Sequence, residues 1–227
     1  SYVMHPFRPR FRLTHWRELL SFTVWLQANN LINFFNKHVE NLLVSRSLGV
    51  AAVGSLTMAR ESGLLLREFL QPVNRAAYPG FAKASHDPAA LCELYRAVLG
   101  FMLLVGVPVG AGLSAVAHLF VPTVLGAKWL QLIPLIELFA LFSVLSLMMA
   151  SGNNVLIALG KPRLATFIIS FRLMVFVAVV VWGLPSYELL IVPYAMGASL
   201  SSALCLSFYH LHRAIGLSAR HMVALLV

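Results

Sequence analysis

The chain has 227 residues, of which 59% are apolar and only 11% are charged, and its formal net charge is +9. A soluble domain has about 25% charged residues, so this composition excludes a soluble globular protein. Long, nearly charge-free runs recur along the chain. In a bilayer such runs satisfy their backbone polar groups as helices, whereas a closed barrel would show short alternating segments. The sequence therefore predicts an all-α integral membrane protein.

Hydropathy, with Gly, Pro and charged residues as boundaries, predicts a bundle of six transmembrane helices within residues 16–213. The predicted helices are Arg17–Phe35, Val50–Gln71, Ala89–Phe120, Leu130–Leu159, Arg163–Gly183 and Leu189–Leu211. Residues 1–15 precede them as a basic loop. Residues 214–227 begin a further apolar stretch that is too short to span about 30 Å, and we expect it to be the start of a truncated transmembrane helix.

The first predicted helix carries a cluster of amides in an otherwise apolar segment. Gln27, Asn30 and Asn33, with Asn29 beside them, form a polar surface. Amide groups suit sugar hydroxyls or phosphate as hydrogen-bond partners. Amide hydrogen bonds between helices would explain the same residues. The sequence leaves both interpretations open.

The second predicted helix carries paired charges. Arg60 and Arg67 are seven residues apart, as are Glu61 and Glu68, and Arg75 continues the same side. Seven residues at 3.6 per turn return a side chain to nearly the same angle, so these charges form one stripe. A stripe that faced lipid would cost ~3 kcal/mol per charge near the bilayer centre. It therefore faces protein or water, either as ion pairs that lock helices together or as the wall of a water-filled cavity.

Single charges interrupt the fourth and fifth predicted helices, at Glu137 and Arg172. Each is expected to face the interior of the bundle or to pair with another charge. Both are candidate coupling residues. For Glu137 the coupling ion would be a proton, because burial favours the neutral form of a carboxyl group.

Basic residues are unevenly divided between the alternating loops, with ten on the side of residue 1 and three on the other side. The first set is Arg8, Arg10, Arg12, Arg17, Arg75, Lys83, Lys161, Arg163, Arg213 and Arg220, and the second is Lys37, Arg46 and Lys128. Cytoplasmic loops are rich in Lys and Arg. The bias therefore predicts that residues 1–15, 75–87, 160–163 and 212–220 are cytoplasmic, and it supports an even number of crossings.

The sequence lacks the motifs of several enzymatic chemistries. Gly160-Lys161 has neither the preceding Gly nor the following hydroxyl residue of a phosphate-binding P-loop. His210 and His212 fall on different faces of a helix with no carboxylate nearby, which disfavours a metal site. Most loops have fewer than about twelve residues, too few for a soluble catalytic domain. We therefore predict that the protein is not an enzyme, with no catalytic residue, metal, cofactor or nucleic-acid partner.

Four groups of residues together resemble a known family of membrane transporters. They are Glu40-Asn-Leu-Leu-Val-Ser-Arg-Ser-Leu-Gly49 followed by Ala52-Val-Gly54, then Tyr78-Pro79-Gly-Phe81, then Val107-Pro108-Val-Gly-Ala-Gly112-Leu with Leu125-Gly126-Ala-Lys128-Trp129, and Ala158-Leu-Gly160-Lys161. Their order and spacing resemble the polysaccharide transporter branch of the multidrug/oligosaccharidyl-lipid/polysaccharide exporter superfamily, which includes the O-antigen flippases. Glu40 stands where this family usually has Asp, and Ser55 where it usually has Tyr.

The resemblance implies a MATE-like fold in which two six-helix lobes enclose a cavity, with this chain as the second lobe. It implies export, by alternating access, of an undecaprenyl-pyrophosphate-linked oligosaccharide from the cytoplasmic to the periplasmic leaflet of a bacterial inner membrane. The expected partners are this lipid-linked substrate, the membrane lipids and a missing N-terminal lobe of the same protein.

The same resemblance gives the polar residues their expected roles. The charged stripe is expected to meet the pyrophosphate, because guanidinium groups suit its oxygens. The amides of the first helix are expected to meet the sugars. The candidate substrate-binding residues are thus Arg60, Glu61, Arg67, Glu68, Arg75, Gln27, Asn30 and Asn33.

Two other functions remain open. A multidrug cation antiporter of the same superfamily would present a carboxylate to its substrate and coupling ion, whereas the candidate cavity residues are rich in arginine. A membrane-embedded glycan polymerase or glycosyltransferase would need a metal-binding pair of Asp residues or a large outside loop with catalytic residues. The sequence shows neither feature.

Overall fold

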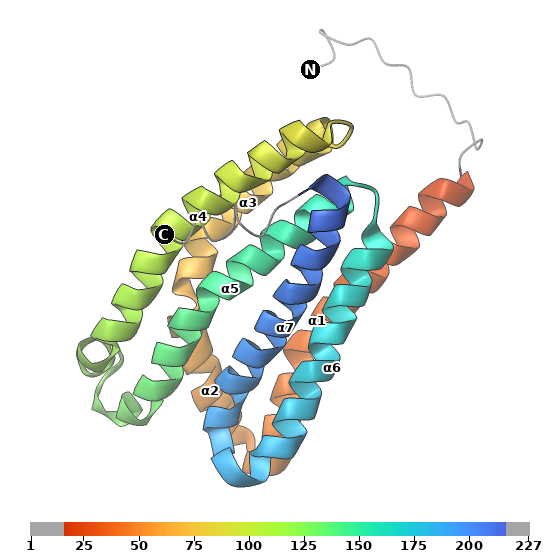
Figure 1. Ribbon diagram of the computed structural model, residues 1–227. Coiled ribbons are helices and arrows are strands. Elements are labelled where there is room, and N and C mark those ends of the chain that lie inside the picture. The colour runs from red at the N-terminus through yellow and green to blue at the C-terminus, as the bar shows by residue number, and fades with distance from the viewer. Residues whose placement is uncertain (1–15, 217–227) are drawn as a thin grey trace, which may run out of the picture.

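The computed structural model describes residues 16–216, apart from the side chains at 16–19, 22, 37 and 184–188, and every regular element in that range is a helix (Figure 1). The long helices are α1 (Trp16–Leu48), α2 (Val50–Gly63), α3 (Leu65–Ala84), α4 (Pro88–Phe120), α5 (Ile133–Ala158), α6 (Pro162–Tyr187) and α7 (Ile191–Ile215). A π-helical turn (Val121–Leu125) and a 3₁₀ turn (Ala127–Leu132) join α4 to α5, and a second 3₁₀ turn (Glu188–Leu190) joins α6 to α7. The predicted all-helical class is confirmed for this range.

Four segments are long and apolar enough to cross a bilayer, namely Pro88–Leu125, Ala127–Ala158, Pro162–Gly183 and Ile191–Ile215. They correspond to the last four predicted helices, and the chain is a multi-pass membrane protein. Helix α1 and the α2–α3 pair pack beside them, but amides and charges interrupt their apolar runs. Six crossings therefore stay a prediction.

Helices α2 and α3 follow one another in the same general direction, and with this pair taken as one arm the long helices run alternately in opposite directions, as Figure 1 shows. The α3–α4 and α5–α6 turns lie at one end of the bundle, together with the last turn of α7. The α1–α2, α4–α5 and α6–α7 connections lie at the other end. We call these the Lys161 end and the Lys128 end, after a basic residue at each. The predicted cytoplasmic segments thus gather at the Lys161 end, except that residues 1–15 and 217–220 lie outside the described residues.

Helix α1 is longer than predicted, because it continues past Phe35 to Leu48. The loop expected after residue 35 is therefore helical, and Lys37 falls within α1, although its side chain lies outside the described residues. This segment contains no Gly or Pro to end a helix. Val44, near its end, is fully buried in a core cluster with Phe176 and Val180 of α6. Packing against α6 therefore stabilises a segment whose polar residues had suggested a loop.

The second predicted helix is in fact two helices. Helix α2 ends at Gly63, Leu64 separates it from α3 with φ −92° and ψ 8°, and α3 runs through Pro72 to Ala84. The predicted end at Gln71 is therefore wrong, and most of the expected loop after it is helical. Gly63, the last residue of α2 before this break, lies where α5 approaches closely. A Cβ added to Gly63 would lie 2.5 Å from the Cβ of Phe139.

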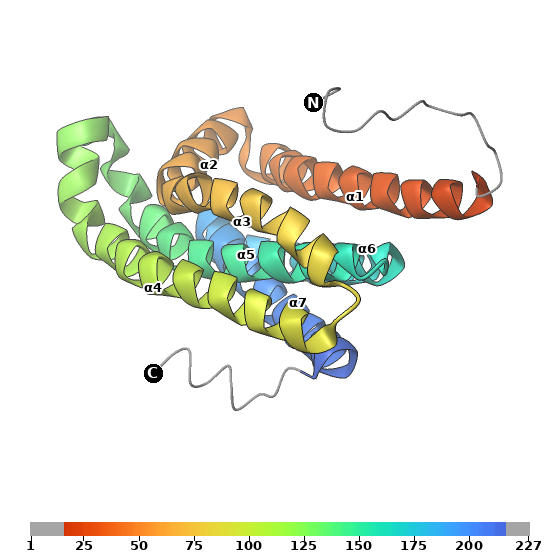
Figure 2. The same ribbon diagram turned by 90° about the horizontal axis from the view of Figure 1, so that it is seen from above.

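Helix α5 lies at the centre of the bundle and packs against α2, α3, α4 and α7. Small residues allow these close contacts, as is common between membrane helices. Gly152 of α5 lies against Ser207 of α7, and Gly197 of α7 lies against the ring of Phe142. Seen from above, α1 and α4 occupy opposite edges of the bundle (Figure 2).

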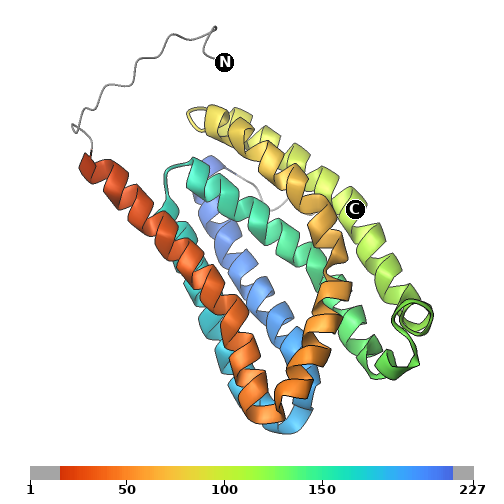
Figure 3. The same ribbon diagram turned by 180° about the vertical axis from the view of Figure 1, so that it is seen from behind.

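Helices α1 and α2–α3 form a V whose arms meet at the Lys128 end and separate toward the Lys161 end (Figure 3). Near the vertex α1 packs against α2. Behind the V lie α5, α6 and α7. The space between the arms is the place where the charged stripe of α2–α3 can meet polar residues of α1.

Candidate functional site

A polar cavity of about 570 Å³ lies between the arms of the V, with α5, α6 and α7 behind it. Its polar lining consists of Asn33, Asn36 and Glu40 from α1, Arg60 and Glu61 from α2, Arg67, Glu68, Gln71, Asn74 and Arg75 from α3, Ser146, Asn153 and Asn154 from α5, Arg172 from α6, and Ser199 from α7. Few apolar residues complete it, among them Met149, Phe176 and Leu200.

The cavity lies near the middle of the bundle's height. Arg172 follows the start of α6 by ten residues, which at 1.5 Å per residue is ~15 Å, about half the thickness of a hydrocarbon core. Charged groups at this depth are costly when they face lipid and are usually found against protein or a water-filled space. The structure therefore explains how this membrane protein accommodates several arginines and glutamates at mid-height.

The structure brings most of the predicted site residues together. All five residues of the charged stripe (Arg60, Glu61, Arg67, Glu68 and Arg75) line the cavity, and so do Asn33 and Arg172. Their alignment follows from helical periodicity across the short break at Leu64. The stripe therefore faces a cavity and not lipid, which was one of the two alternatives left by the sequence.

Gln27 and Asn30 do not line this cavity, and both are exposed on another face of α1. At 100° per residue they point roughly 180° and 120° away from Asn36, which does line it. The sequence placed these amides on one surface because they are close in the chain. The rotation of α1 about its axis, set by its packing on α6, divides them between two surfaces.

Glu137 also lies away from the cavity. It is half-buried near the beginning of α5, nine residues or ~14 Å before Ser146, the first cavity residue of that helix. Unlike Arg172, Glu137 is therefore not part of the cavity lining, and its coupling role stays a prediction. Nothing in the described part of the chain pairs Glu137 with a basic group.

Glu40 and Arg60 form an ion pair between α1 and α2, in which a guanidinium N–H of Arg60 donates to the Glu40 carboxylate. Their side chains are only 13% and 12% exposed. The Nε of Arg60 is buried without a hydrogen-bond partner, so this guanidinium has unused donor capacity. For Arg60, the ion-pair alternative and the cavity-wall alternative are both correct. Sequence analysis missed the pairing because the partners lie on different helices.

The other cavity arginines differ from Arg60. Within residues 16–216 neither Arg67, Arg75 nor Arg172 has an ion-pair partner within 4.0 Å. Arg172 is half-buried and lies within electrostatic range of both Arg67, which repels it, and Glu40, which attracts it. Glu61 and Glu68 are exposed, so they leave the interior of the cavity with a positive surplus at Arg67 and Arg172.

Sequence analysis missed the uncharged half of the lining. Asn74, Asn153 and Asn154 line the cavity, as do the hydroxyl groups of Ser146 and Ser199. The signal for Asn74 was available, because it follows Arg67 by seven residues and so continues the stripe. The Asn153-Asn154 pair interrupts an apolar run of the fourth predicted helix.

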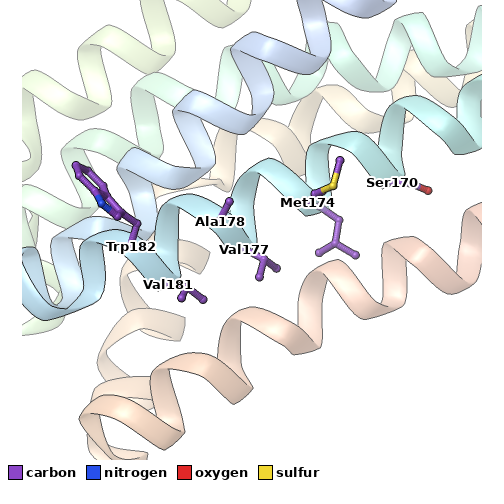
Figure 4. A pocket seen from close by; sticks show the side chains of 7 residues that line it. Ser170, Met174, Val177, Ala178, Val181 and Trp182 are labelled. Atoms are coloured by element: carbon purple, nitrogen blue, oxygen red, sulfur yellow. The ribbon is translucent and has the colours of Figure 1, made fainter.

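A second concavity, of about 820 Å³, lies along α6 and is almost entirely apolar. Figure 4 shows Met174, Val177, Ala178, Val181 and Trp182 along one stretch of α6. Met174, Val181 and Trp182 are exposed. In a membrane protein this surface suits lipid acyl chains, and the hydroxyl group of its one polar lining residue, Ser170, donates to the carbonyl oxygen of Thr166 within α6. No cluster of metal-ligating side chains occurs among the residues that the structure describes.

Residues 1–134 of the chain match the model of the family described as polysaccharide biosynthesis proteins. The chain belongs to this family. The family expected from the sequence motifs is thereby confirmed.

Curated relatives of the chain carry related names. The teichuronic acid biosynthesis protein TuaB of Bacillus subtilis is 27% identical over 69% of this chain and 33% of its own length. The lipopolysaccharide biosynthesis protein WzxC of Escherichia coli is 31% identical over 69% of this chain and 31% of its own length. The chain thus spans about a third of the length of these two relatives.

A solved structure has the same fold. A MOP superfamily transporter from Pyrococcus furiosus superposes with a TM-score of 0.70 over 92% of this chain and 50% of its own, at 14% sequence identity. The helices of this chain are therefore arranged as in half of that transporter.

Proposed function

We propose that this chain forms one lobe of a flippase that exports undecaprenyl-pyrophosphate-linked oligosaccharides across the bacterial inner membrane. The observation that carries the proposal is the cavity at mid-height of the bundle, whose interior presents Arg67 and Arg172 without ion-pair partners among the described residues. The family match and the names of the relatives point to the same process.

The arginines suit the pyrophosphate that joins lipid to sugar. A guanidinium presents a planar set of N–H donors that matches phosphate oxygens and keeps its charge at any physiological pH. Arg67 and Arg172 both line the cavity and repel each other. A pyrophosphate between them would relieve this repulsion, which favours binding of an anion.

The size of the cavity suits a head group and not a whole lipid-linked substrate. Its volume of about 570 Å³ lies within the usual ~300–1,000 Å³ of small-ligand sites. The lipid tail would stay in the bilayer while the polar head group enters. The second lobe of the same protein would supply the opposite wall, because the chain covers only about half of the transporter that it superposes on.

Alternating access would carry the head group from one leaflet to the other. In our proposal the Lys161 end is cytoplasmic, because Lys83, Lys161 and Arg213 lie at that end and basic residues favour the cytoplasm. The separated arms of the V then present the cavity to the cytoplasmic leaflet, where lipid-linked substrates are assembled. Closure of α1 toward α3 would be the motion that hides the cavity from this side.

A multidrug cation antiporter fits the cavity less well. Its substrate would need an accessible carboxylate inside the cavity, but the buried carboxylate, Glu40, is already paired with Arg60. Glu61 and Glu68 are exposed. The interior therefore favours anions over cations.

The decisive experiment uses the full-length protein in liposomes. A fluorescent undecaprenyl-pyrophosphate-linked oligosaccharide is placed in one leaflet, and its appearance in the other is followed with a membrane-impermeant lectin. We expect flipping above the rate of protein-free liposomes. Absence of flipping, together with efflux of a cationic dye from the same vesicles, would replace our proposal with the antiporter.

A further inference from the structure

One side of the cavity is uncharged. Helix α5 contributes Ser146, Asn153 and Asn154 to the lining and no charged residue, and Asn74 of α3 lies on the helix that packs against it. We call these four residues the neutral wall. The charged lining residues all come from α1, α2, α3 and α6. The α5 side of the cavity therefore carries amides and hydroxyl groups without a charge, and Asn74 adjoins it from α3, which also supplies the charged residues Arg67, Glu68 and Arg75.

The neutral wall has unused hydrogen-bonding capacity. Asn74 is only 3% exposed, and its Oδ1 has no hydrogen-bond partner. The Oδ1 of Asn153 is likewise buried without a partner. Buried acceptors without donors are uncommon in folded proteins and call for a ligand or water that supplies the missing donor. Both of these amides line the cavity, so the missing donor is expected to come from its contents.

Along the bundle, Asn74 and Asn153 of the neutral wall lie between Arg67 and the Lys161 end. Asn74 follows Arg67 by seven residues, or ~10 Å along α3 toward that end. Asn153 lies five residues before the last residue of α5, or ~8 Å from the same end. A molecule whose anionic group meets Arg67 would therefore place an adjoining neutral group against Asn74 and Asn153.

We propose that the neutral wall binds the sugar next to the pyrophosphate and determines which glycans the protein accepts. The proposal rests on the function proposed above and assigns a specificity role to Asn74 and Asn153. A side-chain amide offers both donors and acceptors, and so do the hydroxyl groups of a sugar. A phosphate group offers mainly acceptors and is better served by guanidinium groups. The neutral wall thus discriminates between glycans, while the arginines bind the part common to all lipid-linked substrates.

The test compares two probes with the purified full-length protein. One probe is undecaprenyl pyrophosphate, and the other is undecaprenyl pyrophosphate that carries a disaccharide. We expect the wild-type protein to bind the glycosylated probe at least about tenfold more tightly. The variants Asn74→Leu and Asn153→Leu, which keep the number and branching of the side-chain heavy atoms but remove the amide, should lose most of this preference while they bind the bare lipid as before. Asn153→Gln, which keeps the amide, should retain part of the preference.

Asn41→Leu is the matched control, because the Oδ1 of Asn41 is also buried without a partner but Asn41 does not line the cavity. It should leave both affinities unchanged. Equal binding of both probes by the wild-type protein, or an unchanged preference in Asn74→Leu and Asn153→Leu, overturns the proposal for the neutral wall. If these variants lose affinity equally for both probes, the proposal is overturned as well. Failure of the wild-type protein to bind either probe overturns the proposed function instead.

Discussion

Glu40 of α1 and Arg60 of α2 form an ion pair that joins the two arms of the V beside the cavity, although twenty residues separate them in the chain. The two helices also pack against each other, and their connecting turn lies at the vertex of the V. The pair therefore fixes the arms near the vertex, whereas Arg67, further along α3, has no partner among the described residues. Two arginines of one stripe thus have different expected roles.

Replacing Arg60 with Gln is expected to lower the amount of folded protein and its export activity together. Loss of the guanidinium leaves the buried carboxylate of Glu40 without its partner, which costs about 1–3 kcal/mol. Immunoblots of membranes, read beside complementation of an export-deficient strain, measure both effects. The double variant Glu40→Gln with Arg60→Gln should regain protein level, because neither partner is then a stranded charge. Normal abundance of Arg60→Gln with lost export would instead make Arg60 a substrate ligand.

Gly63→Ala is expected to destabilise the protein by about 1–3 kcal/mol, as overpacking of a close contact does. The new methyl group would lie 2.5 Å from the Cβ of Phe139 and 3.0 Å from the carbonyl oxygen of Ile136, neither of which belongs to a flexible chain end. Thermal unfolding of the detergent-solubilised protein measures the change. Gly54→Ala, in the same helix with open space around it, is the control and should be neutral or stabilising. Equal melting temperatures for the two variants would show that α2 and α5 are not in close contact.

Local spacing predicted the charged stripe correctly, but it did not predict how the helices face one another. Arg60, Arg67 and Arg75 share a side because of helical periodicity alone, and the cavity lies on that side. Which face of α1 meets the cavity depends instead on Val44 and its neighbours packing against α6, a contact between segments more than 120 residues apart. For this reason the prediction from the sequence placed Gln27 and Asn30 on one polar surface with Asn33 and did not include Asn36.

The predicted boundaries of the first two helices were wrong for a related physical reason. In α1 the polar residues after Phe35 suggested a loop, but in the fold this segment is helical and two of them, Asn36 and Glu40, line the cavity. In α3 the chain passes through Pro72, and the break occurs at Leu64, next to Gly63, where α5 leaves no room for a side chain. Both outcomes depend on packing against neighbouring helices, and the hydropathy of a single segment carries no information about that packing. The apolar helices α4 to α7, whose signal is local, were predicted to within a few residues.

Cysteine labelling is expected to place the Lys161 end in the cytoplasm. In a full-length variant with Cys92 and Cys205 replaced by Ser, Lys161→Cys should resist a membrane-impermeant maleimide in intact cells, and Lys128→Cys should react. The expectation rests on the basic residues that gather at the Lys161 end and on the alternation of the helices. Permeabilised cells, in which both positions should react, give the control. Labelling of Lys161→Cys in intact cells would reverse the orientation and with it the leaflet to which the cavity opens.

Replacing Arg67 with Gln is expected to reduce export about tenfold to a hundredfold while leaving the amount of protein in the membrane nearly unchanged. A charge-assisted hydrogen bond to a phosphate oxygen contributes about 1.5–3 kcal/mol, which corresponds to that range of affinity. Arg67 has no ion-pair partner in the described part of the chain, so its removal strands no buried carboxylate and even relieves its repulsion of Arg172. Arg46→Gln is the matched control, because Arg46 is an exposed arginine in the last turn of α1 that does not line the cavity. The measurement is the rate of flipping of a labelled lipid-linked oligosaccharide, divided by the amount of reconstituted protein. Equal rates for Arg67→Gln and Arg46→Gln would remove Arg67 from the binding site, and a matching loss of protein would show that it stabilises the fold as Arg60 does.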